Sequence, residues 1–129
     1  MSASTGYPGD RDPNLFVMQF TPAPKQSYDS VVAAIEAELR DVREKGVTGE
    51  ELDRARRAAE SSFLWEKTST SGLAQDLAYN QAVHGDWRYT VQYLDMVRSV
   101  TSQDIQEVAA KYLVPSNRTI ATLERPTSE

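Results

Sequence analysis

Two strand-type segments stand almost a hundred positions apart in this sequence, and helical patterns fill the space between them. Residues 15–21 are apolar and β-rich and stop at Pro22, and residues 118–124 return to β-type residues before the chain meets another proline. Two strands alone are rarely a stable sheet. The near-continuous apolar character of the first segment also indicates neighbours on both faces or both edges. The sequence therefore predicts a chain that is part of a larger body or pairs with a copy of itself.

The first two of five predicted helices follow the first strand. Apolar residues recur at steps of three and four from Ser27 until Gly46, which predicts an amphipathic helix that ends at this glycine. A second helix is expected to start at Thr48, which forms a capping box with Glu51. It should run out in the polar stretch 67–72.

Three further helices are predicted before the second strand. The third ends at Gly85, after which Asp86 is expected to cap a fourth helix that presents Trp87 on its buried side. The fifth helix repeats the design of the second, with Thr101 as cap and Asp104 as its acidic partner.

These elements predict one α+β domain, with helices packed on one face of an incomplete β-sheet. At 129 residues the chain has room for one domain. Residues 1–13 are rich in Gly, Pro and Asp and are read as a loop that leads into the domain. The domain itself is expected at residues 14–125, and residues 126–129 are expected to be a tail.

Composition narrows the possible functions. A net charge of −5 gives no broad positive field for nucleic acid or an anionic membrane. The sequence has no apolar run approaching 18 residues and no pattern typical of a secretory signal at its start. Zero cysteines exclude disulfides, thiolate catalysis and cysteine-based zinc sites, and they leave the compartment open.

No residue is assigned a catalytic, cofactor-binding or metal-binding role. A hydrolytic zinc site usually needs three protein ligands, and this chain has one histidine. His84 lies next to a predicted helix end, where a partly positive imidazole is favoured by the helix dipole, so we interpret it as structural.

Two groups of polar residues could have either a structural or a catalytic role. Glu50, Glu51 and Asp53 could act as paired carboxylates, but the first turn of a helix is where acidic residues are expected. The Ser/Thr-rich stretch 68–71 could hold a nucleophile, but no G-x-S-x-G turn is present, so it is predicted to be a helix-linking, cap-bearing loop.

Basic and aromatic residues together can hold single-stranded nucleic acid, which makes Arg54, Arg56 and Arg57 worth weighing. Acidic residues interleave with them, and Glu60 is at helical pairing distance from two of these arginines. A solvated, salt-paired face is the better interpretation. The aromatic residues considered with this cluster are Trp65, Tyr79, Trp87, Tyr89 and Tyr93.

Two longer motifs point to a family. Residues 46–56 read Gly-Val-Thr-Gly-Glu-Glu-Leu-Asp-Arg-Ala-Arg, and residues 100–113 read Val-Thr-Ser-Gln-Asp-Ile-Gln-Glu-Val-Ala-Ala-Lys-Tyr-Leu. Between them lie the Ser/Thr-rich break and a glycine-marked turn at residues 84–86, and an Asn-Arg-Thr strand follows at residues 117–119. In this order the motifs resemble those of the insulinase, pitrilysin and mitochondrial-processing-peptidase group of zinc metallopeptidases. The similarity extends from about Asp12 to Pro126.

The resemblance implies a fragment of the LuxS/MPP-like metallohydrolase fold. Members of the group bind zinc in their first domain through an H-x-x-E-H motif and a distant glutamate, and nothing here matches that motif. Zinc is therefore expected in the catalytic domain of the parent protein and not in this chain. A later, non-catalytic domain contributes an arginine and a tyrosine to substrate binding, upstream of the strand that corresponds to Leu15–Phe20. Tyr7 falls near that region but lacks the preceding arginine.

The function implied by the resemblance is that of a non-catalytic segment, inactive by itself, which contributes to the wall of a peptide-binding chamber. The expected partners are the remaining domains of the same protein or a catalytic partner subunit, an unfolded peptide substrate, and a second copy through exposed strand edges. Nucleic acid and a membrane span are not expected. The alternative is a structural or partner subunit of the same fold with no protease role.

Overall fold

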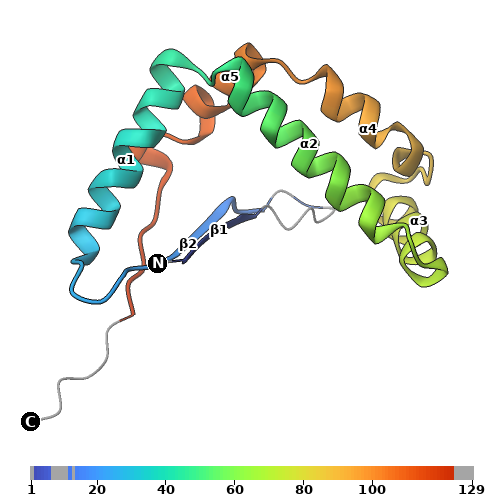
Figure 1. Ribbon diagram of the computed structural model, residues 1–129, viewed down its shortest axis with the longest axis horizontal. Coiled ribbons are helices and arrows are strands. Elements are labelled where there is room, and N and C mark those ends of the chain that lie inside the picture. Colours follow the sequence, from blue (N-terminus) through green and yellow to red (C-terminus); the bar gives the residue numbers. More distant parts are fainter. Residues whose placement is uncertain (1, 7–11, 13, 124–129) are drawn as a thin grey trace, which may run out of the picture.

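The computed structural model describes residues 2–6, 12 and 14–123 of the chain. Figure 1 shows the helices as an open arch, with α1 and α5 on one side and α2, α3 and α4 on the other. The elements in chain order are β1 (Ser2–Gly6), β2 (Val17–Thr21), α1 (Tyr28–Lys45), α2 (Gly49–Glu66), α3 (Thr70–His84), α4 (Tyr89–Ser99), α5 (Ser102–Tyr112) and the 3-10 turn η1 (Pro115–Asn117).

The strands β1 and β2 form an antiparallel hairpin, which is the one sheet in the described part of the chain. Its register pairs Ser2 with Thr21. The prediction that residues 1–13 are a loop is therefore wrong for residues 2–6, and the remaining positions of that loop, except Asp12, lie outside the described residues. Strand preference depends on context, so ladder bonds to β2 can hold a Ser-, Thr- and Gly-containing segment that has little preference of its own.

Helix α1 begins and ends where the sequence predicts. The Ser27 hydroxyl oxygen accepts a hydrogen bond from the Ser30 amide at 3.2 Å, which satisfies a free N–H group of the first turn. Gly46 ends the helix with a φ of 72°, and its N–H donates to the Val42 carbonyl at 2.9 Å. A glycine is needed there, because a positive φ strains other residues and a Cβ would lie 3.1 Å from the Ser102 hydroxyl.

Both predicted capping boxes are confirmed. In α2 the Thr48 hydroxyl accepts from the Glu51 amide at 3.2 Å, and the Glu51 carboxylate accepts from the Thr48 amide at 2.9 Å. In α5 Thr101 and Asp104 make the same two bonds at 3.2 and 2.7 Å. Each box satisfies two N–H groups that have no partner within the helix ladder.

The turn between α3 and α4 differs from the prediction at one end. Gly85 ends α3 with a φ of 76°, as predicted. The Asp86 carboxylate then accepts from the Arg88 amide at 2.9 Å, and Arg88 occupies the N-cap position of α4. The predictions that Asp86 caps this helix and that the helix presents Trp87 are wrong, since α4 begins at Tyr89. An aspartate can bond to the backbone two residues ahead, and here this local turn takes the place of a helix cap.

The helices pack as two groups. Helix α1 packs mainly against α5, and α4 packs against α2 and α3. Val31 of α1 and Ala109 of α5 are the buried apolar residues among those described, with exposed fractions of 6% and 2%. The other apolar side chains of the described part are at least partly exposed to solvent.

The second group is joined by an aromatic stack and a polar contact. The rings of Phe63 on α2 and Tyr93 on α4 are stacked with centroids 5.0 Å apart. The buried Asn80 amide on α3 donates to the Thr90 hydroxyl on α4 at 3.0 Å. The Lys67 ammonium lies over the Phe63 ring at 4.3 Å and pairs with Asp76 on α3 at 3.0 Å, which links α2 to α3. These contacts hold α2, α3 and α4 together without a continuous apolar core.

The two groups meet at the apex of the arch, where the α1–α2 turn and the α4–α5 turn lie side by side (Figure 1). The Ser102 hydroxyl donates to the Val47 carbonyl at 2.6 Å and accepts from the Val47 amide at 3.2 Å. Arg56 donates to the Val100 carbonyl at 2.6 Å. We refer to Val47, Arg56, Val100 and Ser102 as the apex cluster.

The second predicted strand is absent from the described residues. Residues 118–123 are irregular, and Glu124 lies outside the described part. Arg118 forms an ion pair with Glu36, and the Tyr28 hydroxyl donates to the Leu123 carbonyl at 3.1 Å. The β-type residues of this segment have no neighbouring strand to pair with, so sequence preference alone does not produce a strand.

The described chain is mostly helical. Helices on one face of a larger sheet, as the α+β class and the LuxS/MPP-like arrangement require, stay a prediction, because the described sheet has two strands. None of the described helices is long and apolar enough to cross a membrane.

Candidate interaction surface

His84 lies among aromatic side chains. It occupies the last turn of α3, and its ring stacks on Tyr89 with centroids 4.2 Å apart. Tyr79 meets the same imidazole edge-on at 6.4 Å. Within the described ranges, no group of three or more His, Asp and Glu side chains is placed to hold a metal ion. The residues around His84 therefore do not fit zinc, and their contacts are those of a packed helix end.

The acidic residues at the start of α2 are engaged in capping. Hydrogen bonds from the Thr48 amide and hydroxyl hold the pKa of the Glu51 carboxyl below its usual value. Asp53 pairs with Arg56 at 3.2 Å. The capping interpretation is therefore confirmed for Glu51, while Asp53 forms an ion pair with Arg56.

The Ser/Thr-rich stretch links two helices, as predicted. The Thr68 hydroxyl donates to the Trp65 carbonyl at 2.7 Å, and the Ser69 hydroxyl accepts from the Gly72 amide at 3.0 Å. Ser69 is the N-cap of α3. These hydroxyl groups are used by the backbone of the turn.

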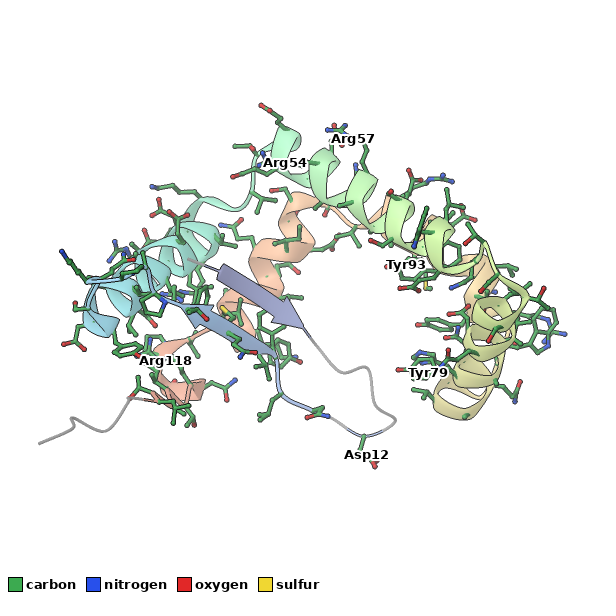
Figure 2. The ribbon with its side chains drawn as sticks, turned by 60° about the horizontal axis from the view of Figure 1, so that its bottom comes forward. Asp12, Arg54, Arg57, Tyr79, Tyr93 and Arg118 are labelled. Carbon is green, nitrogen blue, oxygen red and sulfur yellow. The ribbon has the colours of Figure 1, made fainter. Side chains whose placement is uncertain are left out.

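Glu60 forms an ion pair, but its partner differs from the predicted Arg56 or Arg57. Its carboxylate accepts from the Arg98 guanidinium at 2.8 Å across the contact between α2 and α4, and it does not pair with Arg56 or Arg57. A contact between helices determines this pair, which spacing along one helix does not show. Arg54 and Arg57 project away from the opening of the arch (Figure 2), consistent with a solvated face.

The most conspicuous feature of the described chain is its exposed apolar side chains. Trp65, at the end of α2, has an exposed fraction of 78%, and a shallow depression beside it is lined by other residues of the same helix. Tyr79 lies on the side of α3 that faces the opening of the arch (Figure 2). We define the apolar surface as the large hydrophobic residues exposed by more than a third, which are Leu15, Phe16, Val17, Tyr28, Leu64, Trp65, Leu73, Tyr79, Trp87, Tyr89, Val91, Val100, Val108, Tyr112, Ile120 and Leu123.

The aromatic residues weighed for nucleic-acid stacking are partly occupied by one another. Tyr93 stacks on Phe63 and Tyr89 stacks on His84. The Arg88 guanidinium lies over the Trp87 ring, 5.0 Å from the ring centroid. These rings therefore do not form one continuous stacking platform, which supports the salt-paired interpretation of this region.

Comparison with known proteins gives the relationship. The family described as "Peptidase M16 inactive domain" matches residues 1–59. A solved structure described as a "putative zinc protease from Bordetella pertussis Tohama I" is similar, with 31% identity and a TM-score of 0.65. The chain is thus similar to the inactive domain of the peptidase M16 family. The resemblance inferred from the capping motifs is thereby confirmed, and the M16 match is to the inactive domain. Among curated proteins, none matches this chain.

A second solved structure supports the same similarity. It is described as the "Inactive Peptidase Domain of a Putative Zinc Protease from Bordetella parapertussis", with 29% identity and a TM-score of 0.67. The alignments cover 78% and 82% of this chain but 57% and 58% of the two solved chains. The chain thus spans less than two thirds of either relative.

Sequence reasoning did not identify the apolar surface residue by residue. Alternation and helical spacing distinguish an apolar face from a polar one, but they do not show whether a neighbour covers that face. The sequence contains one indirect signal: it predicts two strands, and two strands are too few for a stable sheet. Tyr7, the position nearest the family's substrate-binding tyrosine, lies outside the described residues.

Proposed function

We propose that this chain is a structural, non-catalytic segment of an M16-type zinc peptidase. Its role is to form part of the wall of a chamber that encloses an unfolded peptide, while the zinc-binding domain of the parent protein performs the cleavage. In that domain a zinc-bound water would attack the peptide bond. The proposed segment is the domain at residues 14–125, with residues 126–129 as a tail.

The apolar surface is the observation that carries this proposal. A freely acting domain of this size is expected to have a core of fully buried large hydrophobic residues, and among the described residues no large side chain is fully buried. Trp65 and Leu64 at the end of α2 are exposed by 78% and 58%, and Val108 and Tyr112 on α5 by 56% and 50%. Apolar side chains are therefore exposed on both sides of the arch. This exposure supports the proposal that the chain is part of a larger protein.

The polar residues support a structural role as well. Of the acidic residues that could have formed an acid–base pair, Glu51 is used in a cap and Asp53 in an ion pair, and the imidazole contacts two tyrosine rings. Side chains in such roles orient helices. They offer a reacting peptide neither a free base nor a metal ligand set.

Reconstitution with the zinc-binding domain of the parent protein tests the proposal. Cleavage of an unstructured fluorogenic peptide should require both parts and should be abolished by a chelator. A Trp65→Ser/Leu64→Ser variant should weaken complex formation, whereas Arg54→Ala, on the outward side of the same helix, should not. Undiminished cleavage by the zinc-binding domain without this chain would contradict the proposal. Complex formation with a zinc-free partner, without cleavage, would instead favour the purely structural subunit.

A further inference from the structure

We propose that residues 118–123, which we name the C-terminal segment, form a β-strand with the free edge of β2 in a second copy of this chain. The proposal concerns how the sheet is completed and does not depend on the peptidase assignment. It rests on an unused strand donor and an unused strand acceptor that occur together in one chain.

The donor is the C-terminal segment. No hydrogen bond among the described residues uses a backbone group of positions 118–122. Arg118 is held by its ion pair with Glu36, and the Leu123 carbonyl is held by the Tyr28 hydroxyl. Arg118 has extended dihedrals, with φ of −135° and ψ of 142°. A segment rich in β-type residues is thus fixed at both ends, with its intervening N–H and C=O groups open to a partner strand.

The acceptor is the outer edge of β2. One edge of β2 pairs with β1, and within the described residues nothing pairs with the other. Exposed edges are normally protected by charged side chains or proline. The β2 sequence Val-Met-Gln-Phe-Thr has neither. Its exposure alternates, with Met18 and Phe20 half-buried and Val17, Gln19 and Thr21 exposed, so one face is suited to packing.

A second copy fits these two features. The contacts to Glu36 and Tyr28 hold the C-terminal segment against its own α1, and no backbone hydrogen bond among the described residues joins it to its own β2. In a two-fold dimer each copy can donate its segment to the β2 edge of the other, which closes the assembly. The five residues of β2 and the six residues of the segment are similar in length. Arg118 is the one charged residue among them. A third strand in each sheet also brings the hairpin to the size at which sheets become stable.

Sedimentation equilibrium of the 129-residue chain tests this pairing over about 1 to 100 μM, a range that resolves micromolar dissociation constants. The test variant is Ala121→Pro/Thr122→Pro, because neighbouring residues direct their N–H groups to opposite edges of a strand and the double change blocks both. The control is Thr70→Pro, at the first position of α3, where proline is tolerated. We expect dimers for the unchanged chain and the control, and a monomer of unchanged helix content for the double variant.

Hydrogen exchange of the unchanged chain gives a second measurement that needs no variant. Amides of residues 118–123 and of β2 should exchange about tenfold more slowly, or slower still, at the highest concentration than at the lowest. A monomer across the whole range would overturn the proposal. A dimer in which the double variant associates as strongly as the control, or in which these amides gain no protection, would overturn it too.

Discussion

Replacing Ser102 by alanine removes the central contact of the apex cluster. The Ser102 hydroxyl donates to the Val47 carbonyl at 2.6 Å and accepts from the Val47 amide at 3.2 Å. The site is partly buried, and both groups of Val47 belong to the turn that joins the two halves of the arch. One hydroxyl therefore fixes the spacing of the α1–α2 and α4–α5 connections.

The expected loss follows from these two bonds. Each neutral hydrogen bond contributes about 0.5 to 1.5 kcal/mol of net stability, and more when its partner is left buried without a replacement. Alanine offsets up to about 0.5 kcal/mol through its higher helix propensity at the start of α5. We therefore expect Ser102→Ala to lower the free energy of unfolding by about 2 kcal/mol. With a urea m-value of about 2 kcal/mol/M, the midpoint should fall by roughly 1 M.

Urea unfolding followed by circular dichroism measures this shift, with all samples at the same low concentration so that association does not contribute. Ser71→Ala is the matched control, because Ser71 is an exposed serine in the first turn of α3 and makes none of the hydrogen bonds described above. Its midpoint should stay within about 0.3 M of the unchanged chain. Equal midpoints for the two variants would refute the view that the hydroxyl of Ser102 couples the two turns.

Further predictions concern the helix caps, the small core and the dependence of stability on pH. Thr48→Ala and Thr101→Ala should each lower the free energy of unfolding by about 1 kcal/mol in urea titrations, since each removes a capping box. Ala109→Leu should lower it by about 1 to 3 kcal/mol in the same titrations, because Ala109 is 2% exposed against α1. Hydrogen bonds from Thr48 and Thr101 lower the pKa of Glu51 and Asp104 in the folded chain. Their contribution is therefore complete above the unfolded pKa values, about 4.3 and 3.9, and is lost as the pH falls through the lower folded values. Unfolding measured against pH should show this loss, and Glu51→Gln should reduce it.

The features predicted well from the sequence are those that local residues determine. Gly46 and Gly85 end their helices, and Thr48 and Thr101 start theirs, because the bonds involved span only three or four positions. For the same reason, the family resemblance could be inferred from motifs that consist mostly of caps and packing positions.

The features that the sequence did not predict depend on distant contacts. Residues 2–6 are a strand because they pair with β2, and residues 118–123 are not a strand because no described strand pairs with them. Glu60 pairs with Arg98 because α4 crosses α2 at that point. At Asp86 a local turn and a helix cap compete for one carboxylate, and residue preferences do not decide between them. The apolar surface is of the same kind, since exposure depends on neighbours and not on residue type.

Calorimetric titration of the purified chain with zinc, combined with a cleavage assay on an unstructured peptide, tests most directly whether this chain is a non-catalytic part. We expect no tight zinc binding and no cleavage above the rate of peptide alone. Stoichiometric zinc binding together with cleavage that a chelator abolishes would contradict a structural role, and it would place a metal site at His84 and nearby carboxylates.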